Sequence, residues 1–170
     1  HVVGMVKEYI SPHEALPLLV SVPSGMSDKM LTELRDIVNH NEARLVGWCT
    51  CLEATALSVP AMRDVAHALS LVAHVERGAL SLGVVELERG FPALLCSRQF
   101  EWPSQSPFPV ERVPEALEHL LSTLSEEHAL RSQDLQSLLV SGEEAWVPHL
   151  VPVLEQRLPC PHIPLERPQL

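Results

Sequence analysis

Glycine is scarce in this sequence, at 7 of 170 residues, and aromatic residues make up only 4% of it. So few glycines leave few places where the backbone could wrap closely around a phosphate group. The sequence also lacks the G-x-x-x-x-G-K-[ST] loop, the G-x-G-x-x-G turn, the H-E-x-x-H helix and the G-x-S-x-G elbow. Generic motifs therefore assign no nucleotide, zinc-protease or serine-hydrolase site.

Long apolar runs are absent as well. The longest, such as Leu16–Val22, are far shorter than the roughly 20 residues that cross a bilayer, and no basic-then-apolar leader opens the chain. Lys and Arg number 12 against 22 Asp and Glu, and the resulting net charge of -10 repels phosphate backbones and anionic membranes. We therefore expect a cytoplasmic protein that neither binds nucleic acid nor inserts into a membrane.

Cysteine is sparse too, and the chain is long enough to fold around an apolar core without a disulfide framework. Cys49 and Cys51 fit one face of a strand, as two small apolar side chains. A zinc site needs about four ligands, and neither this pair nor Cys160 with His162 has a second pair at a completing distance. We expect no bound metal.

Apolar residues, at 46%, instead supply a pattern of alternating elements in the first part of the chain. The predicted elements are a helix over 2–10, a buried strand over 16–22, a helix over 27–40 with Ser27 as N-cap, a strand over 44–51 and a short helix over 53–58. A strand, a helix and a second strand in this order imply a parallel crossover.

The middle of the chain changes character, because three apolar segments at 68–75, 79–86 and 92–100 are separated by short charged tips that end in glycine. This pattern predicts an antiparallel meander. The later elements are a proline-rich loop over 102–109, a helix over 113–128, a strand over 135–140, a tight turn at Ser141-Gly142, a helix with an apolar side over 147–158 and a proline-rich end over 159–168. The fold class is therefore α/β.

Three segments stand in an order that is similar to a known family. Residues 19–24 (LVSVPS) with 51–57 (CLEATAL) are similar to a V-T-V-P-A strand and an N-E-P-T-A-A-A helix, residues 74–87 lie where D-L-G-G-G-T-x-D is found, and residues 139–148 are similar to V-G-G-x-x-x-I-P. These are motifs of the nucleotide-binding unit of actin, sugar kinases and the seventy-kilodalton heat-shock chaperones, which the chain resembles from about residue 17 to 165.

The resemblance implies an actin-like ATPase (ribonuclease H-like) fold with a mixed sheet, in which an antiparallel three-stranded meander is flanked by helices. Residues 1–60 would form the C-terminal part of the first lobe, and residues 61–170 the second lobe with its insert subdomain reduced or missing. The nucleotide site would then involve six positions: Glu76, Arg77, Gly78, Ala79, Ser141 and Gly142.

The chain departs from the family where the family does its chemistry. In the family's hairpin, glycines allow backbone amides to approach the terminal phosphates closely. Carboxylates there bind the metal ion and position the attacking water. Here His74 and Ser81 stand at the two aspartate positions, Glu76 and Arg77 replace glycines, and Ala79 replaces the threonine. We expect no catalytic residues and no cofactor, with ATP and Mg²⁺ as the alternative.

These departures lead to the hypothesis of a degenerate actin-like or chaperone-like module that acts as a protein-interaction scaffold without ATP hydrolysis. The alternative is a fragment of an ATP-dependent chaperone-like or sugar-kinase-like enzyme whose catalytic groups lie in a missing N-terminal part.

Phe100, Trp102 and Phe108 flank the proline-rich loop, and Trp146 precedes the last helix. We expect the first three to pack over the core, the alternative being an exposed contact patch.

Overall fold

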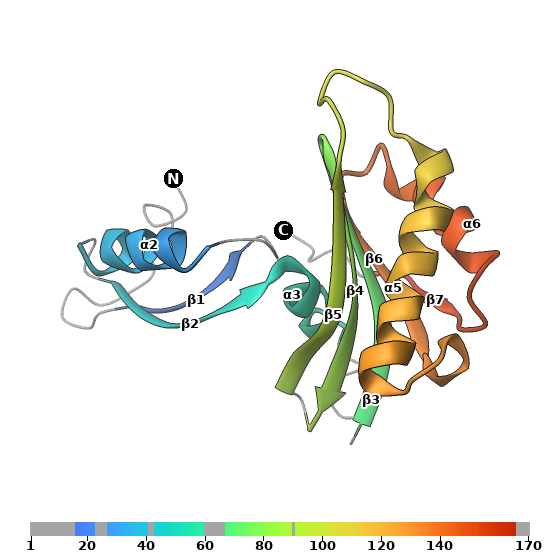
Figure 1. Ribbon diagram of the computed structural model, residues 1–170. Helices are drawn as coiled ribbons and strands as arrows, with labels where there is room; N and C mark the ends of the chain where they lie inside the picture. The colour runs from blue at the N-terminus through green and yellow to red at the C-terminus, as the bar shows by residue number, and fades with distance from the viewer. Residues whose placement is uncertain (1–15, 23–26, 41–42, 60–66, 90, 166–170) are drawn as a thin grey trace. The chain divides into compact units, whose positions relative to one another are not determined.

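The computed structural model describes residues 16–22, 27–40, 43–59, 67–89 and 91–165 (Figure 1). The chain divides into two compact units, residues 1–50 and 51–170. The helix expected over 2–10 lies outside the described residues. No helix in the described ranges combines the length and the apolar character that spanning a membrane requires.

The described residues of the first unit form a strand, a helix and a second strand. Strands β1 (Leu16–Val22) and β2 (Ala43–Thr50) pair in parallel, and helix α2 (Asp28–His40) connects them. The predicted parallel crossover is thus confirmed. Val38 is buried, as expected for the apolar side of α2, which contacts β2.

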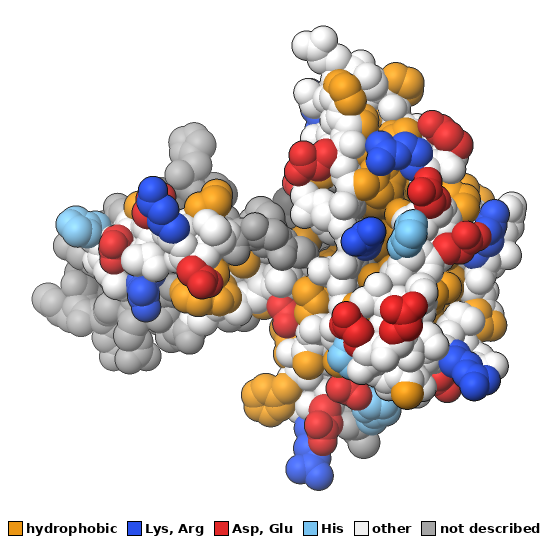
Figure 2. All heavy atoms as spheres, viewed as in Figure 1, with side chains coloured by type: hydrophobic (Ala, Val, Ile, Leu, Met, Phe, Trp, Pro, Cys, Tyr) orange, Lys and Arg blue, Asp and Glu red, His pale blue; other side chains and the backbone are white. Residues whose placement is uncertain are grey.

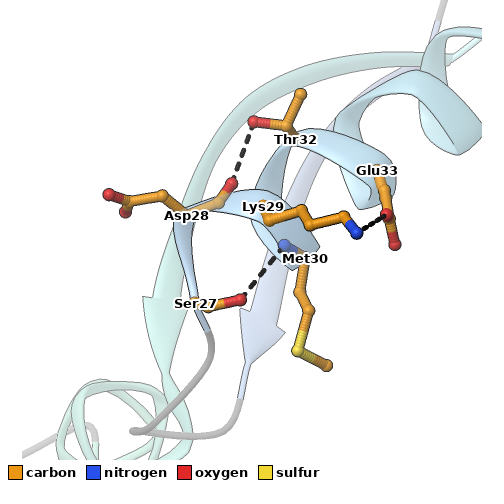
Figure 3. A network of polar contacts seen from close by, with 6 residues as sticks. All are labelled: Ser27, Asp28, Lys29, Met30, Thr32 and Glu33. Carbon is orange, nitrogen blue, oxygen red and sulfur yellow. Dashed lines mark hydrogen bonds and ion pairs between the residues drawn. The ribbon is translucent and has the colours of Figure 1, made fainter.

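The start of α2 follows from its first residues, as Figure 3 shows. The Ser27 hydroxyl accepts a hydrogen bond from Met30 N at 3.4 Å, which confirms Ser27 as the N-cap. Thr32 Oγ1 donates to Asp28 O at 2.9 Å, and Lys29 Nζ lies 3.9 Å from Glu33 Oε1. These contacts are exposed and local, so they fix where the helix begins without tying it to another element.

The second unit is built on a five-stranded mixed sheet with the order β5-β4-β3-β6-β7. Strands β3 (His67–Glu76), β4 (Ala79–Glu88) and β5 (Phe91–Glu101) form the predicted antiparallel meander. Strands β6 (Ser137–Gly142) and β7 (His162–Ile163) run parallel to β3. The α/β class with a mixed sheet is therefore confirmed.

Helices cover both faces of this sheet (Figure 1). Helix α5 (Val113–His128) and helix α6 (Val147–Glu155) pack on one face, and the short helix α3 (Cys51–Leu57) packs on the other. Short 3₁₀ turns precede α5 at Val110–Arg112 and β6 at Ser132–Asp134. The α5 face holds the larger apolar core, to which β3 contributes Leu69, Leu71, Ala73 and Val75.

The structure differs from the sequence predictions at several joints. Cys51 starts α3 instead of extending a strand beside Cys49, and Ser141 and Gly142 belong to the end of β6 instead of a separate turn. The short strand β7 was not predicted, because prolines surround its two residues. The two compact units divide after Thr50, because α3 packs on the larger sheet.

Candidate functional site

The six positions that the resemblance singled out lie together at one end of the five-stranded sheet. Glu76 to Ala79 form the β3–β4 turn, and the parallel register sets Val75 of β3 beside Gly142 of β6. We call this region the β3–β4 end: residues 74–79, together with Thr55 and residues 141–146. The side chains of Glu76 and Arg77 are exposed, whereas Ala79 is buried.

Two glycines at this end are required by the backbone. Gly142 has a φ of +118°, and a Cβ there would overlap the carbonyl group of Val75. Gly78 has a φ of +87°, and a Cβ there would lie 3.0 Å from Trp102 O. These glycines are therefore explained by close packing of the chain on itself.

The neighbouring main-chain groups are also paired within the protein. Glu143 N donates to Val75 O at 2.7 Å, which ties the segment after β6 to the end of β3. Trp102 N donates to Gly78 O at 2.9 Å, which ties the segment after β5 to the hairpin turn. A phosphate-binding turn presents free backbone amides to its ligand, so the engaged Glu143 amide is not available for that purpose.

A chain of polar side chains joins three elements on the α3 face. Thr55 Oγ1 of α3 donates to Cys51 O at 2.8 Å, and Ser141 Oγ of β6 lies 2.8 Å from Thr55 Oγ1. His74 Nδ1 of β3 lies 2.8 Å from the same Ser141 oxygen. Since the single Thr55 proton is given to Cys51, the assignment that satisfies all three contacts has Ser141 donate to Thr55 and His74 Nδ1–H donate to Ser141.

His74 is held as a neutral side chain by this environment. Burial lowers its pKa below the ordinary histidine value, and the charge of Glu76 opposes that shift to a smaller extent. Where the resemblance implies a carboxylate that serves a metal ion, the chain thus holds an uncharged imidazole whose Nδ1 is already engaged. Ser81, at the other aspartate position, is buried and also uncharged.

A second set of contacts closes over the hairpin turn. Arg77 Nη2 lies 3.8 Å from Glu143 Oε1, and Trp146 Nε1 donates to Glu143 Oε2 at 2.8 Å. Glu143 therefore binds the turn on one side and the start of α6 on the other. The Arg77 side chain is 73% exposed, so solvent screens this ion pair and its contribution to stability is small.

Four aromatic side chains near the β3–β4 turn form a row of ring contacts: Phe100, Trp102, Phe108 and Trp146. Trp102 lies between Phe100, at a centroid distance of 5.8 Å, and Phe108, at 5.3 Å, and Phe108 lies 5.9 Å from Trp146. Trp102 and Phe108 are buried, and Phe100 and Trp146 are partly buried against the same core. The expectation that the residues of the proline-rich loop pack over the core is confirmed, and they do not form an exposed patch.

Four residues outside the six positions that the resemblance singled out complete the contacts at this end: Thr55, His74, Glu143 and Trp146. In the sequence, His74 stands out only as a departure from the family pattern, and Thr55 and Glu143 lie unremarked within the segments 51–57 and 139–148. The register of β3 beside β6 sets His74 next to Ser141, whereas no sequence pattern marks the contacts of Thr55, Glu143 and Trp146.

Within the described ranges, no three His, Cys, Asp or Glu side chains are grouped so that they could hold an ion. Burial raises the pKa values of the Cys96 and Cys160 thiols, which disfavours the reactive thiolate, and both cysteines are free.

The sequence matches no protein-family model and no curated protein. The geometry of the β3–β4 end is therefore the basis for a functional proposal.

Proposed function

We propose that the chain is a degenerate actin-like module that binds other proteins and does not hydrolyse ATP. The mixed sheet of the second unit supports this proposal, since it joins an antiparallel meander to parallel strands and carries helices on both faces. That arrangement is the one implied by the resemblance to actin, sugar kinases and chaperones.

The observation that carries the proposal is the internal pairing of polar groups at the β3–β4 end. Thr55, Ser141 and His74 hydrogen-bond to one another, and Glu143 contacts Arg77 and Trp146. No buried side-chain nitrogen or oxygen in the described part of the chain lacks a partner. Groups that are satisfied by each other have little to gain from a phosphate, which would first have to displace those contacts.

The charges at this end also disfavour a triphosphate. The carboxylates of Glu76 and Glu143 stand near the turn, and the Arg77 cation already faces the Glu143 carboxylate. Hydrolysis additionally needs oxygen ligands for Mg²⁺ and a group that positions the attacking water. A neutral histidine and a buried serine at the aspartate positions supply neither of these.

Exposed apolar side chains favour a role in protein binding. Met30 and Ile37 of α2 are 51% and 60% exposed, and Trp48 of β2 is 42% exposed. Met30 and Ile37 are separated by two helical turns, so they lie on the same side of α2. Large apolar side chains that share an exposed face are typical of surfaces that contact other proteins.

A phosphate-release assay with ATP and Mg²⁺ tests the loss of hydrolysis. We expect the full chain to release phosphate no faster than buffer, because the groups that would hold Mg²⁺ and water are absent from the site. Saturable phosphate release that requires the protein would refute the proposal and favour an ATP-dependent enzyme.

A double variant examines whether the turn alone blocks hydrolysis. Glu76→Gly with Arg77→Gly opens the turn and removes the ion pair to Glu143, but it leaves His74 and Ser81 in place. We expect no gain of phosphate release. Substantial turnover by this variant would show that the catalytic groups lie elsewhere.

A further inference from the structure

At the opposite end of β4, a groove of about 370 Å³ lies beside the β4–β5 turn. Its lining residues are Glu86, Glu88, Arg89, Phe91, Pro92 and Ala93. Pockets for small molecules typically have volumes of about 300–1,000 Å³, so this groove accommodates one or two side chains and not a large ligand. We call the lining residues and His67 the β4–β5 end.

The sheet register explains why apolar and acidic side chains share this groove. Glu88 is paired with Phe91 and Glu86 with Ala93 across the β4–β5 ladder, and directly paired residues point to the same face. Phe91 is 77% exposed, more than Met30, Ile37 or Trp48. An aromatic ring is thus held in solvent with carboxylates on the neighbouring strand.

The charge of the groove is acidic and only partly compensated. His67 Nδ1 lies 3.5 Å from Glu86 Oε1, so this carboxylate has a neighbour within the sheet. Glu88 and Arg89 have no ion-pair partner among the described residues, and both are exposed. Figure 2 shows acidic, basic and hydrophobic side chains together at the lower end of the larger unit, where Figure 1 places the β4–β5 turn.

We propose that the groove at the β4–β5 end binds a lysine or arginine side chain carried by a segment of a partner protein. The cation would lie over the Phe91 ring and between the Glu86 and Glu88 carboxylates, where cation–π and charge attraction act together. The chain's net charge of -10 favours encounter with a basic partner. A neutral apolar segment in this groove would bury Glu88 without a counter-charge, whereas a cationic segment supplies one.

The same strand already contains an internal pair of this kind. The Arg112 guanidinium lies 4.9 Å from the centroid of the Phe100 ring, near the other end of β5. At that end the protein supplies its own arginine, whereas Phe91 stands open. This inference rests on the proposed function in one respect, because it names the partner chemistry of a protein-binding module.

A fluorescent hexa-arginine peptide is a suitable probe, with hexaglutamate as the probe of opposite charge. We expect the full chain to bind hexa-arginine, measured by fluorescence anisotropy at about 0.15 M salt. Phe91→Leu keeps most of the apolar area but removes the ring face, and it should weaken binding about two- to fivefold. Phe91→Tyr retains the ring and should bind like the parent chain.

Charge variants separate the groove from general attraction to an acidic protein. Glu88→Gln should weaken binding about twofold or more, whereas Glu111→Gln, an exposed residue with the same charge change, should have a smaller effect. Equal affinity of the parent, Phe91→Leu and Glu88→Gln, or no binding of hexa-arginine, would overturn the proposal. The peptide-binding assay contains no nucleotide, so its result is independent of the ATP assay. Phosphate release would refute the proposed function, whereas a parent chain that does not bind hexa-arginine would refute only this docking site.

Discussion

The two ends of the five-stranded sheet contain similar kinds of residue but use them differently. At the β3–β4 end, Arg77 and Glu143 contact each other, and the polar groups beside them are hydrogen-bonded. At the β4–β5 end, Glu88 and Arg89 are exposed and Phe91 stands in solvent. The β3–β4 end is therefore closed by its own side chains, while the β4–β5 end leaves an aromatic ring and two charged side chains exposed.

The largest effect is expected from breaking the closed end at Gly142. Gly142→Ala places a Cβ against the carbonyl group of Val75 at a backbone conformation that other residues rarely adopt. We expect the free energy of unfolding to fall by about 2–4 kcal/mol, measured by urea denaturation. A loss below about 1 kcal/mol would indicate that β6 can end without this close approach to β3.

The hydrogen-bond chain is probed by Thr55→Val, which keeps the shape of the side chain and removes its hydroxyl. Ser141 would lose its acceptor in a part-buried position, and we expect a loss of about 1–2 kcal/mol in the free energy of unfolding. Thr123→Val is the matched control, because Thr123 also donates to the carbonyl four residues earlier in a helix but has no described partner on another element. Equal effects of the two variants would show that the link to Ser141 adds nothing.

The pH dependence of stability tests the neutral state of His74. Burial lowers its pKa in the folded protein, so the unfolded chain binds more protons at pH values between the folded and unfolded pKa. The stability that neutral His74 contributes is present above the unfolded pKa and is lost as the pH falls through the folded pKa. We expect the free energy of unfolding to decrease as the pH falls below the ordinary histidine pKa of 6.5, and His74→Asn to reduce that slope. Identical slopes for the parent and the variant would contradict this assignment.

Arg89→Gly tests the β4–β5 end, and we expect it to cause the smallest of these changes in stability. Arg89 has a φ of +51°, a conformation that glycine adopts more easily, so the variant should be more stable by about 0.5 kcal/mol. Removing the cation from the groove should also tighten hexa-arginine binding. Arg89→Ala separates the two effects, because it removes the charge and keeps a Cβ at positive φ. A gain in stability from alanine as large as from glycine would exclude the backbone explanation.

Much of the fold could be predicted because each element leaves a periodic pattern. The helical stripe of Val113, Leu117, Leu120 and Leu124 is buried as the spacing predicted, and the three apolar segments between residues 67 and 101 form the predicted meander. These patterns report which face of an element is buried. The start of α3 at Cys51 and the existence of β7 could not be predicted in this way, because a short helix and a two-residue strand are too short to show a periodic pattern.

The candidate site was predicted only as a set of positions. The Thr55–Ser141 contact spans 86 positions of the sequence, and the His74–Ser141 contact spans 67. Such contacts depend on the register of β3 beside β6 and on where α3 packs against the sheet. The resemblance brought the hairpin and Ser141-Gly142 to one end, but no local pattern indicates that Glu143 contacts both Arg77 and Trp146. The closure of this end is therefore a tertiary property.

Calorimetric titration of the full chain with Mg²⁺ and ATP tests the central claim most directly, because it measures binding whether or not hydrolysis follows. Since the polar groups of the β3–β4 end are already paired, we predict no saturable heat in the micromolar range. Micromolar binding that is weakened by a change at this end, such as Ser141→Ala, would show that the contacts open to admit a nucleotide and would contradict the account.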